Sequence, residues 1–148
     1  MRRGDLALDD ADRETDARTP APAARQASHS QGRGLTRLAR PVWPDGGWDD
    51  LGPRQHLAVA AGRVGAMSGL SPEHSALYVV YTTMIGSATA AQRLLALDPA
   101  AAAVTFQLSE LCGRTAAQAA EGLADLSDPL LDTLAQRHAE RGRPLFAS

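Results

Sequence analysis

The stretch that decides the fold is SPEHSALYVVYTTMI, residues 71–85. It opens with Ser71, whose hydroxyl can accept a free N–H group of a first helical turn, and with Pro72, whose missing N–H costs that turn nothing. The residues that follow are apolar on almost every side, so we expect a central helix. Gly86 and Ser87 come next and predict an interruption before the helix resumes.

The same pairing of a capping residue with a proline divides the rest of the chain into helices. It recurs at Thr19-Pro20, Asp98-Pro99 and Asp128-Pro129. The predicted helices, besides the one after Ser71, run over residues 20–39, 54–67, from 98 toward Gly122, and 129–141 with Gly142 as the C-cap. No stretch alternates apolar and polar residues long enough to predict a strand. The sequence therefore predicts an all-α fold, a bundle of about five to six helices.

The chain of 148 residues fits one domain with two short ends. Residues 1–18 are rich in acids and arginines and predict an acidic leader, partly helical or disordered. Residues 19–141 form the predicted single helical domain, and residues 142–148 form a C-terminal tail. Between residues 41 and 53, PVWPDGGWDDLGP predicts a stiff loop.

The predicted helix over residues 20–39 has two distinct faces. One carries Ala27, Gln31, Leu35 and Leu38. The other carries His29, Arg33, Arg37 and Arg40. An arginine stripe of this kind is a solvated surface or a contact for phosphates or an acidic protein. It supports an alternative function, a small helical nucleic-acid-binding regulator that uses Arg33, Arg37 and Arg40.

Residues with catalytic chemistry are sparse. All 15 basic residues are arginine, which excludes the lysine of a Walker A loop and that of a Schiff-base enzyme. The single cysteine, Cys112, excludes an internal disulfide and is expected as a buried small hydrophobe within a helix. No nucleophile has a base beside it in the sequence, and no GxSxG elbow occurs. We therefore expect no enzyme.

Metal-binding patterns are also missing from the sequence. The four histidines, His29, His56, His74 and His138, lie in separate segments, so we expect solvent-exposed helix residues and no metal site. The acids Asp45, Asp49 and Asp50 cluster in the loop, where turn chemistry is a better explanation than a cation site.

Charge and hydropathy restrict the location and partners. The formal charge of −2 and the sequence pI near 6.0 argue against a dedicated nucleic-acid binder. No apolar run approaches the roughly 18 residues of a membrane span. The first residues, MRRGDLALDDADRE, turn acidic too soon for a secretory signal. We expect a cytoplasmic protein with no membrane contact.

Three stretches, taken in order, resemble the urease accessory protein UreF family. LDDADRETDARTPAPAARQASHSQGRGLTRLAR contains an Arg-x-x-Ser-x-x-Gln-Gly pattern at Arg25, Ser28, Gln31 and Gly32. GLSPEHSALYVVYTTMIGSATAAQRLLALDP is similar to the central pair of helices of the family, and PLLDTLAQRHAERGRPLFAS is similar to its C-terminus. Members of the family normally carry an additional N-terminal portion that this sequence does not contain.

The resemblance implies a non-catalytic, dimer-forming scaffold for urease maturation. It implies binding to UreD (UreH in some systems), recruitment of the GTPase UreG to apo-urease, and nickel insertion. Nickel and GTP would be handled by partners, with no cofactor on this chain. The resemblance also implies that the C-terminal segment is a docking element for UreD. In this sequence the docking residues would be Arg141, Arg143, Leu145 and Phe146. The alternative is that Phe146 packs against the core of its own chain. A second contact or dimer face would include Arg25, Ser28, Gln31 and Arg33.

Overall fold

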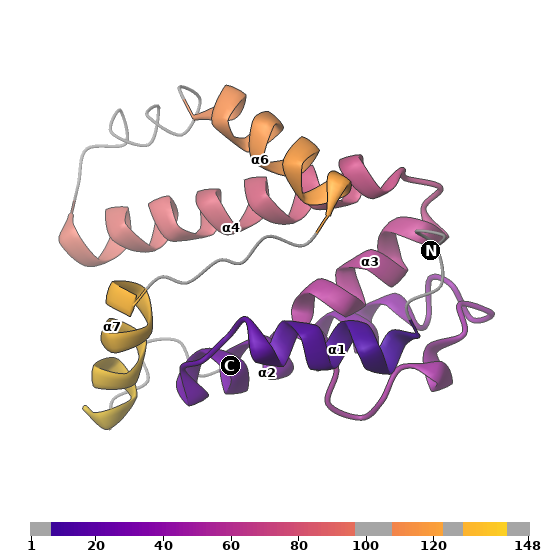
Figure 1. The fold of residues 1–148 in the computed structure, drawn as a ribbon, viewed down its shortest axis with the longest axis horizontal. Helices are drawn as coiled ribbons and strands as arrows, with labels where there is room; N and C mark the ends of the chain where they lie inside the picture. Colours follow the sequence, from indigo (N-terminus) through magenta and orange to yellow (C-terminus); the bar gives the residue numbers. More distant parts are fainter. Residues whose placement is uncertain (1–6, 97–107, 123–128, 142–148) are drawn as a thin grey trace. The chain divides into compact units, whose positions relative to one another are not determined.

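The computed structural model describes residues 7–96, 108–122 and 129–141, and its regular structure there is helical. The described residues contain no strand, which confirms the all-α class, and their six α-helices agree with the predicted five to six. In chain order the elements of Figure 1 are α1 (Leu8–Ala17), α2 (Pro22–Ala39), a short 3-10 helix η1 (Trp48–Asp50), α3 (Leu57–Met67), α4 (Pro72–Leu95), α6 (Ser109–Glu121) and α7 (Pro129–Glu140).

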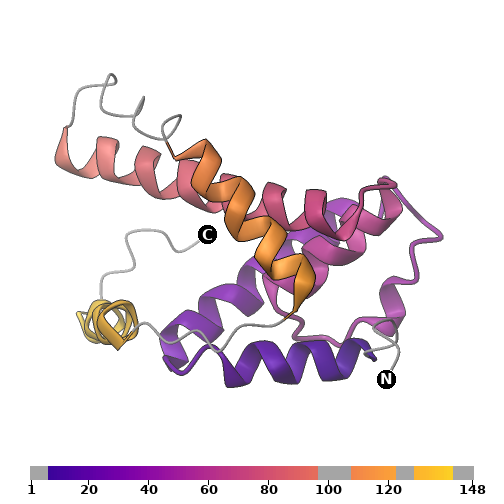
Figure 2. The same cartoon turned by 45° about the horizontal axis from the view of Figure 1, so that its top comes forward.

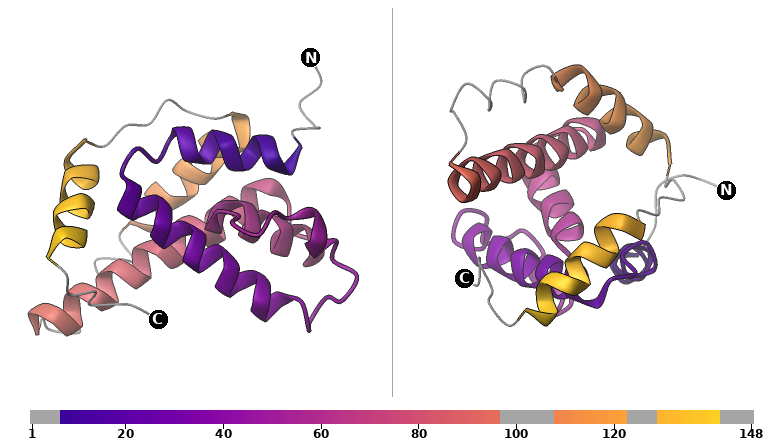
Figure 3. Two further views of the ribbon diagram at one scale, coloured as in Figure 1. Left: turned by 90° about the horizontal axis from the view of Figure 1, so that it is seen from below. Right: turned by 90° about the vertical axis from the view of Figure 1, so that its left-hand side faces the viewer.

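These elements belong to two compact units, each described here by itself. The first unit takes in the described parts of Met1–Val64 and Asp125–Ser148, and the second those of Gly65–Ala124. In the first unit α7 packs beside α2 (Figure 3). In the second, α6 runs back across α4 (Figure 2).

The pairs of a capping residue and a proline predict some of the helix starts better than others. Ser71 is the N-cap of α4, its hydroxyl accepts the N–H of His74 at 3.2 Å, and Pro72 opens the helix, as predicted. Helix α7 begins at Pro129, again as predicted. Helix α2 begins two residues after Pro20, and its N-cap Ala21 has no side-chain cap. The pair Asp98-Pro99 and the C-cap Gly142 lie outside the described residues.

Helix α4 corrects two expectations. It runs without a break through Gly86 and Ser87, and the hydroxyl of Ser87 donates to the carbonyl of Thr83 at 2.9 Å. A glycine inside a helix costs only about 1 kcal/mol, so the remaining turns keep the helix continuous. The prediction that α4 is central was also wrong, because none of its residues is buried.

The second unit is held by small side chains between α4 and α6. Cys112 and Ala116, one turn apart on α6, are almost fully buried. The thiol of Cys112 lies 3.6 Å from the sulfur of Met84 on α4. This confirms the prediction that Cys112 is a buried small hydrophobe rather than an exposed nucleophile.

The loop before α3 is fixed by polar contacts. Trp48 is buried, and its indole N–H donates to the carbonyl of Trp43 at 2.6 Å. Gly47 has a φ of 62°, which an L side chain adopts with strain, so glycine is favoured there. The loop acids form ion pairs within the unit: Asp49 with Arg40 and Asp50 with Arg63.

The buried face of α2 is neither of the two predicted faces. It consists of His29, Gly32, Thr36 and Ala39, while Leu38 is 69% exposed. This face lies against the segment before α3: the side-chain amide of Gln55 donates to the hydroxyl of Thr36 at 2.6 Å. The buried face therefore combines small residues, Gly32 and Ala39, with polar side chains that find hydrogen-bond or ion-pair partners.

Among the helices that the structure describes, none is both long and apolar enough to cross a membrane.

Candidate functional site

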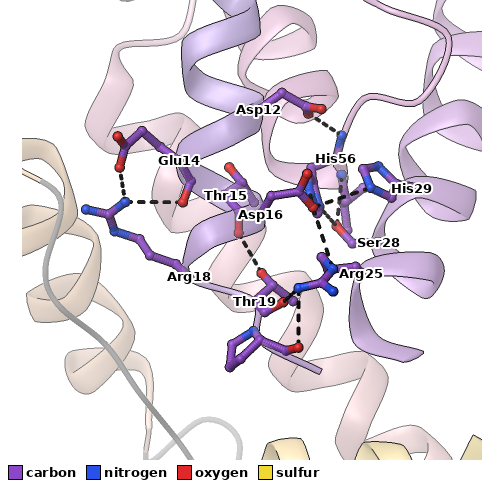
Figure 4. Close-up of polar contacts among 12 residues, drawn as sticks. Asp12, Glu14, Thr15, Asp16, Arg18, Thr19, Arg25, Ser28, His29 and His56 are labelled. Atoms are coloured by element: carbon purple, nitrogen blue, oxygen red, sulfur yellow. Dashed lines mark hydrogen bonds and ion pairs between the residues drawn. The ribbon is translucent and has the colours of Figure 1, made fainter. Parts of the chain in front are cut away.

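A polar cluster forms in the first unit, where α1, α2 and the start of α3 meet (Figure 4). Helix α1 contributes Asp12 and Asp16, which are four residues apart and so share a face. The backbone N–H of His56 donates to the Asp12 carboxylate at 2.7 Å. The Asp16 carboxylate lies 3.0 Å from Nε2 of the same histidine.

Helix α2 contributes Ser28. Its hydroxyl oxygen lies 2.9 Å from Nδ1 of His56 and accepts the backbone N–H of Leu57 at 3.2 Å. Leu57 is the first residue of α3, and His56 precedes it. The free N–H groups at the start of α3 are thus capped by side chains of two other helices, Asp12 and Ser28.

The ring of His56 is completely buried and has a partner on each nitrogen. Because an ionised carboxylate can only accept, the neutral ring carries its proton on Nε2, which donates to Asp16. Nδ1 then accepts the hydroxyl proton of Ser28. Every polar atom of this side chain is satisfied, which allows an imidazole to be buried at low cost.

His29 lies beside His56 with a different set of contacts. The two ring centroids are 4.0 Å apart, with planes tilted by 39°. Nε2 of His29 lies 3.7 Å from the Asp16 carboxylate. Its Nδ1 is buried without a hydrogen-bond partner in the structure, which is uncommon for a buried polar atom.

The surroundings lower the pKa of Asp16 from its ordinary value of 3.8. The largest cause is the hydrogen bond from His56, burial acts in the opposite direction, and smaller electrostatic effects of His56, His29 and Arg25 lower the pKa further. The Arg25 guanidinium lies 3.8 Å from this carboxylate and also donates to the carbonyl of Thr19 at 2.9 Å.

Close backbone contact brings α2 to this cluster. A Cβ atom on Gly32 would overlap the carbonyl oxygen of Gln55 and lie 2.9 Å from the carbonyl carbon of His56. Only glycine lets the helix come so near. Gly32 therefore sets the separation at which Ser28 and His29 can reach His56.

A cavity of about 170 Å³ opens next to the cluster. It lies between the start of α1 and the segment before α3, and its lining includes Leu8, Asp9, Asp12, Leu51 and Gln55. Asp12 thus belongs both to the cavity wall and to the polar cluster.

The cluster contains groups in the order of a hydrolytic triad, Ser28, His56 and Asp16. The hydroxyl of Ser28, however, already accepts the N–H of Leu57, and His56 has no exposed surface to meet a substrate. The arrangement joins three segments rather than activating a nucleophile. The cluster also offers possible metal ligands: one ligand atom each from Asp12, His29 and His56 lie within 4.8 Å of one another.

The expectation of solvent-exposed histidines was wrong for two of the four. His29 and His56 are buried with their rings in tilted contact, whereas His74 and His138 are exposed. The two rings come from residues 27 positions apart, so no local spacing reveals the pair. The indirect signal is the Arg-x-x-Ser-x-x-Gln-Gly pattern, because Arg25, Ser28 and Gly32 all turn toward the cluster.

The residues predicted to bind partners fall into three groups. Arg25 and Ser28 are engaged inside the unit, as described above. Gln31, Arg33 and Arg141 are exposed, and the guanidinium of Arg33 donates to the hydroxyl of Ser30 at 3.1 Å. Arg143, Leu145 and Phe146 lie outside the described residues.

Comparisons with known proteins agree with one another. The model of the UreF family matches residues 1–109. The urease accessory protein UreF of Mycobacterium tuberculosis (strain H37Rv) is 76% identical over 149 aligned positions, which cover 100% of this chain and 71% of that protein. The protein of the same name from Mycobacterium marinum is 77% identical with the same coverage. That of Mycolicibacterium vanbaalenii is 73% identical over 93% of this chain and 64% of its own length. No solved structure matches.

Proposed function

Because the chain belongs to the UreF family of urease accessory proteins, we propose that it acts as a scaffold that binds UreD and recruits the GTPase UreG to apo-urease. Membership in the family gives it a role in urease maturation, as an accessory protein rather than an enzyme. In this proposal nickel is cargo, and the partners handle nickel and GTP. The working form is a homodimer in the cytoplasm.

Exposed apolar side chains support a role in complex formation. On α7, Leu130, Leu131 and Leu134 are each more than half exposed. On α4, Tyr78 and Leu95 are also more than half exposed. A protein that works alone exposes few large apolar groups close together, whereas partner-binding surfaces gather them.

The C-terminal tail is the proposed UreD-docking element. Helix α7 ends at Glu140, and exposed Arg141 leads into the tail. Leu145 and Phe146 would fill an apolar groove on UreD, with Arg141 and Arg143 at its acidic rim. This assignment rests on the resemblance of the tail to the C-terminus of the family.

The outer face of α2 is the proposed second contact. Gln31 and Arg33 are exposed there. Arg25 and Ser28 contribute from the inner side, since their contacts with Asp16 and His56 hold the helix in position. Of the three arginines that the nucleic-acid alternative would use, Arg40 pairs with Asp49 at 3.0 Å, whereas Arg33 and Arg37 are exposed.

Co-expression of the tagged chain with UreD tests the proposal. A stable complex is expected after affinity capture, and Leu145→Ala combined with Phe146→Ala should abolish it while leaving helicity unchanged. The matched control is Val42→Ala combined with Leu70→Ala, two exposed apolar residues outside the helices. Full capture of UreD by the tail variant would show that the tail is not the docking element. Failure of the unmodified chain to capture soluble UreD would contradict the scaffold itself.

A further inference from the structure

The buried pair His29 and His56 lies beside the carboxylates of Asp12 and Asp16. We propose that Asp12, His29 and His56 bind one divalent transition-metal ion of the kind that accepts nitrogen and oxygen ligands, such as Zn²⁺ or Co²⁺. Their ligand atoms already lie within 4.8 Å of one another. Two imidazoles and a carboxylate are a donor set typical of such ions, and a water molecule can complete the coordination.

The unpartnered nitrogen of His29 is the first independent support. The side chain of His29 is only 8% exposed, yet its Nδ1 has no hydrogen-bond partner in the structure. A buried acceptor or donor without a partner costs about 1–3 kcal/mol. A metal ion bound at Nδ1 of His29 would remove that cost.

The partners of His56 are arranged as they are around many metal-bound histidines. Asp16 accepts from Nε2, and a carboxylate in this position fixes the tautomer and orients the opposite nitrogen for a metal. That nitrogen, Nδ1, now accepts from the neutral hydroxyl of Ser28. An ion bound at Nδ1 takes the place of the Ser28 hydroxyl, so Ser28 must rotate away when the metal binds.

The charge balance and the access route both allow a cation. Asp12 and Asp16 bring two negative charges, and Arg25 offsets one of them at 3.8 Å from Asp16. The helix dipole adds a partial positive charge of roughly half a unit at the start of α3. The one negative charge that Arg25 does not offset exceeds this partial charge. Asp12 lines the adjacent cavity, so an ion can reach the cluster from there. The Asp12 carboxylate has lone pairs left for an ion besides the one that accepts the N–H of His56.

Titration of the full chain with metal tests the proposal. The chain is prepared metal-free and without a polyhistidine tag, then titrated with Co²⁺ and with Zn²⁺ by calorimetry and visible absorption. One ion per chain is expected, with Zn²⁺ displacing Co²⁺. His29→Gln should weaken binding roughly ten-fold or more, since even outer-sphere partners of metal sites contribute that much.

Substitutions inside and outside the cluster distinguish binding at this site from binding by exposed histidines. His74→Gln and His138→Gln remove the exposed rings and should leave binding unchanged. Asp12→Asn keeps an oxygen that can accept the N–H of His56 but removes the charge, so it should fold and bind more weakly. Absence of binding to the unmodified chain would overturn the proposal. So would binding that survives both His29→Gln and Asp12→Asn, or binding lost in the exposed-histidine variants.

The unmodified chain gives a readout that no folding defect can obscure. Paramagnetic Co²⁺ should shift or broaden the imidazole NMR signals of His29 and His56. The same effect on His74 and His138 alone would overturn the proposal. Since none of these measurements involves UreD, their outcome is independent of the scaffold proposal.

Discussion

At the scale of single residues, Gly32 has the strictest requirement in the first unit. The backbone of α2 meets the backbone of Gln55 and His56 at this residue, and no flexible side chain lies between them. Gly34, two residues further along the same helix, has open space where its side chain would be. The two glycines have the same chemistry and opposite environments.

Gly32→Ala is therefore expected to lower the free energy of unfolding by about 1–3 kcal/mol, because α2 must move away from the Gln55–His56 backbone. Gly34→Ala is the matched control and should be neutral or stabilising by up to about 1 kcal/mol, as alanine is the better helix former. Urea denaturation followed by circular dichroism measures both. Equal stabilities for the two variants would show that the close contact at Gly32 is absent in solution.

At the scale of elements, α3 depends on side chains outside its own sequence for its N-terminus. No residue of its own caps the N–H groups of His56 and Leu57; Asp12 of α1 and Ser28 of α2 accept them. Helix α4, in contrast, is capped by its own Ser71. The start of α4 could therefore be predicted from local sequence, whereas the predicted start of α3 at residue 54 is three residues before the observed one at Leu57.

Ser28→Ala should destabilise the chain by about 1–2 kcal/mol, since it removes the cap of Leu57 and the partner of His56 Nδ1. Ser30→Ala, on the exposed side of α2, is the control and should change stability by less than about 0.5 kcal/mol. Hydrogen exchange at the N–H of Leu57 measures the effect locally and should accelerate in Ser28→Ala alone. Unchanged exchange would contradict the cap across helices.

At the scale of the whole molecule, few large apolar groups are buried in the residues that the structure describes. Most buried apolar side chains there are alanines, and the largest side chain with less than 2% exposure is His56. Stability therefore depends more than usual on satisfied polar contacts around Asp16, which joins α1 to α2 and to the start of α3. The contacts of Asp16 depend on pH, because protonation removes the charge of its carboxylate.

The lowered pKa of Asp16 predicts acid sensitivity. Since the folded chain holds this carboxylate ionised below its ordinary pKa of 3.8, its contribution to stability is present above that pH and is lost as the pH falls through the lowered value. Asp16→Asn lacks this contribution, so the stability difference from the unmodified chain should shrink as pH drops below about 4. Unfolding by urea at a series of pH values measures this. Asp45→Asn, in the exposed loop, is the control, and a constant difference for Asp16→Asn would refute the prediction.

Several residues show how far the sequence alone could predict the site. The spacing of Arg25, Ser28 and Gly32 marks a special surface of α2, but the sequence analysis assigned Arg25 and Ser28 to partner binding. Their observed contacts are with Asp16 and His56. A helical pattern gives the face on which a residue lies and not the neighbour it meets, because that neighbour comes from a distant part of the chain.

The sequence by itself determined the helical class, the start of α4 at Ser71-Pro72 and the buried state of Cys112, because capping chemistry and helical periodicity act within a few residues. Only the tertiary structure decided which face of α2 is buried, that His29 contacts His56, and that two other helices cap α3. These features depend on contacts between residues up to 44 positions apart in the chain. Such contacts form only when the helices pack.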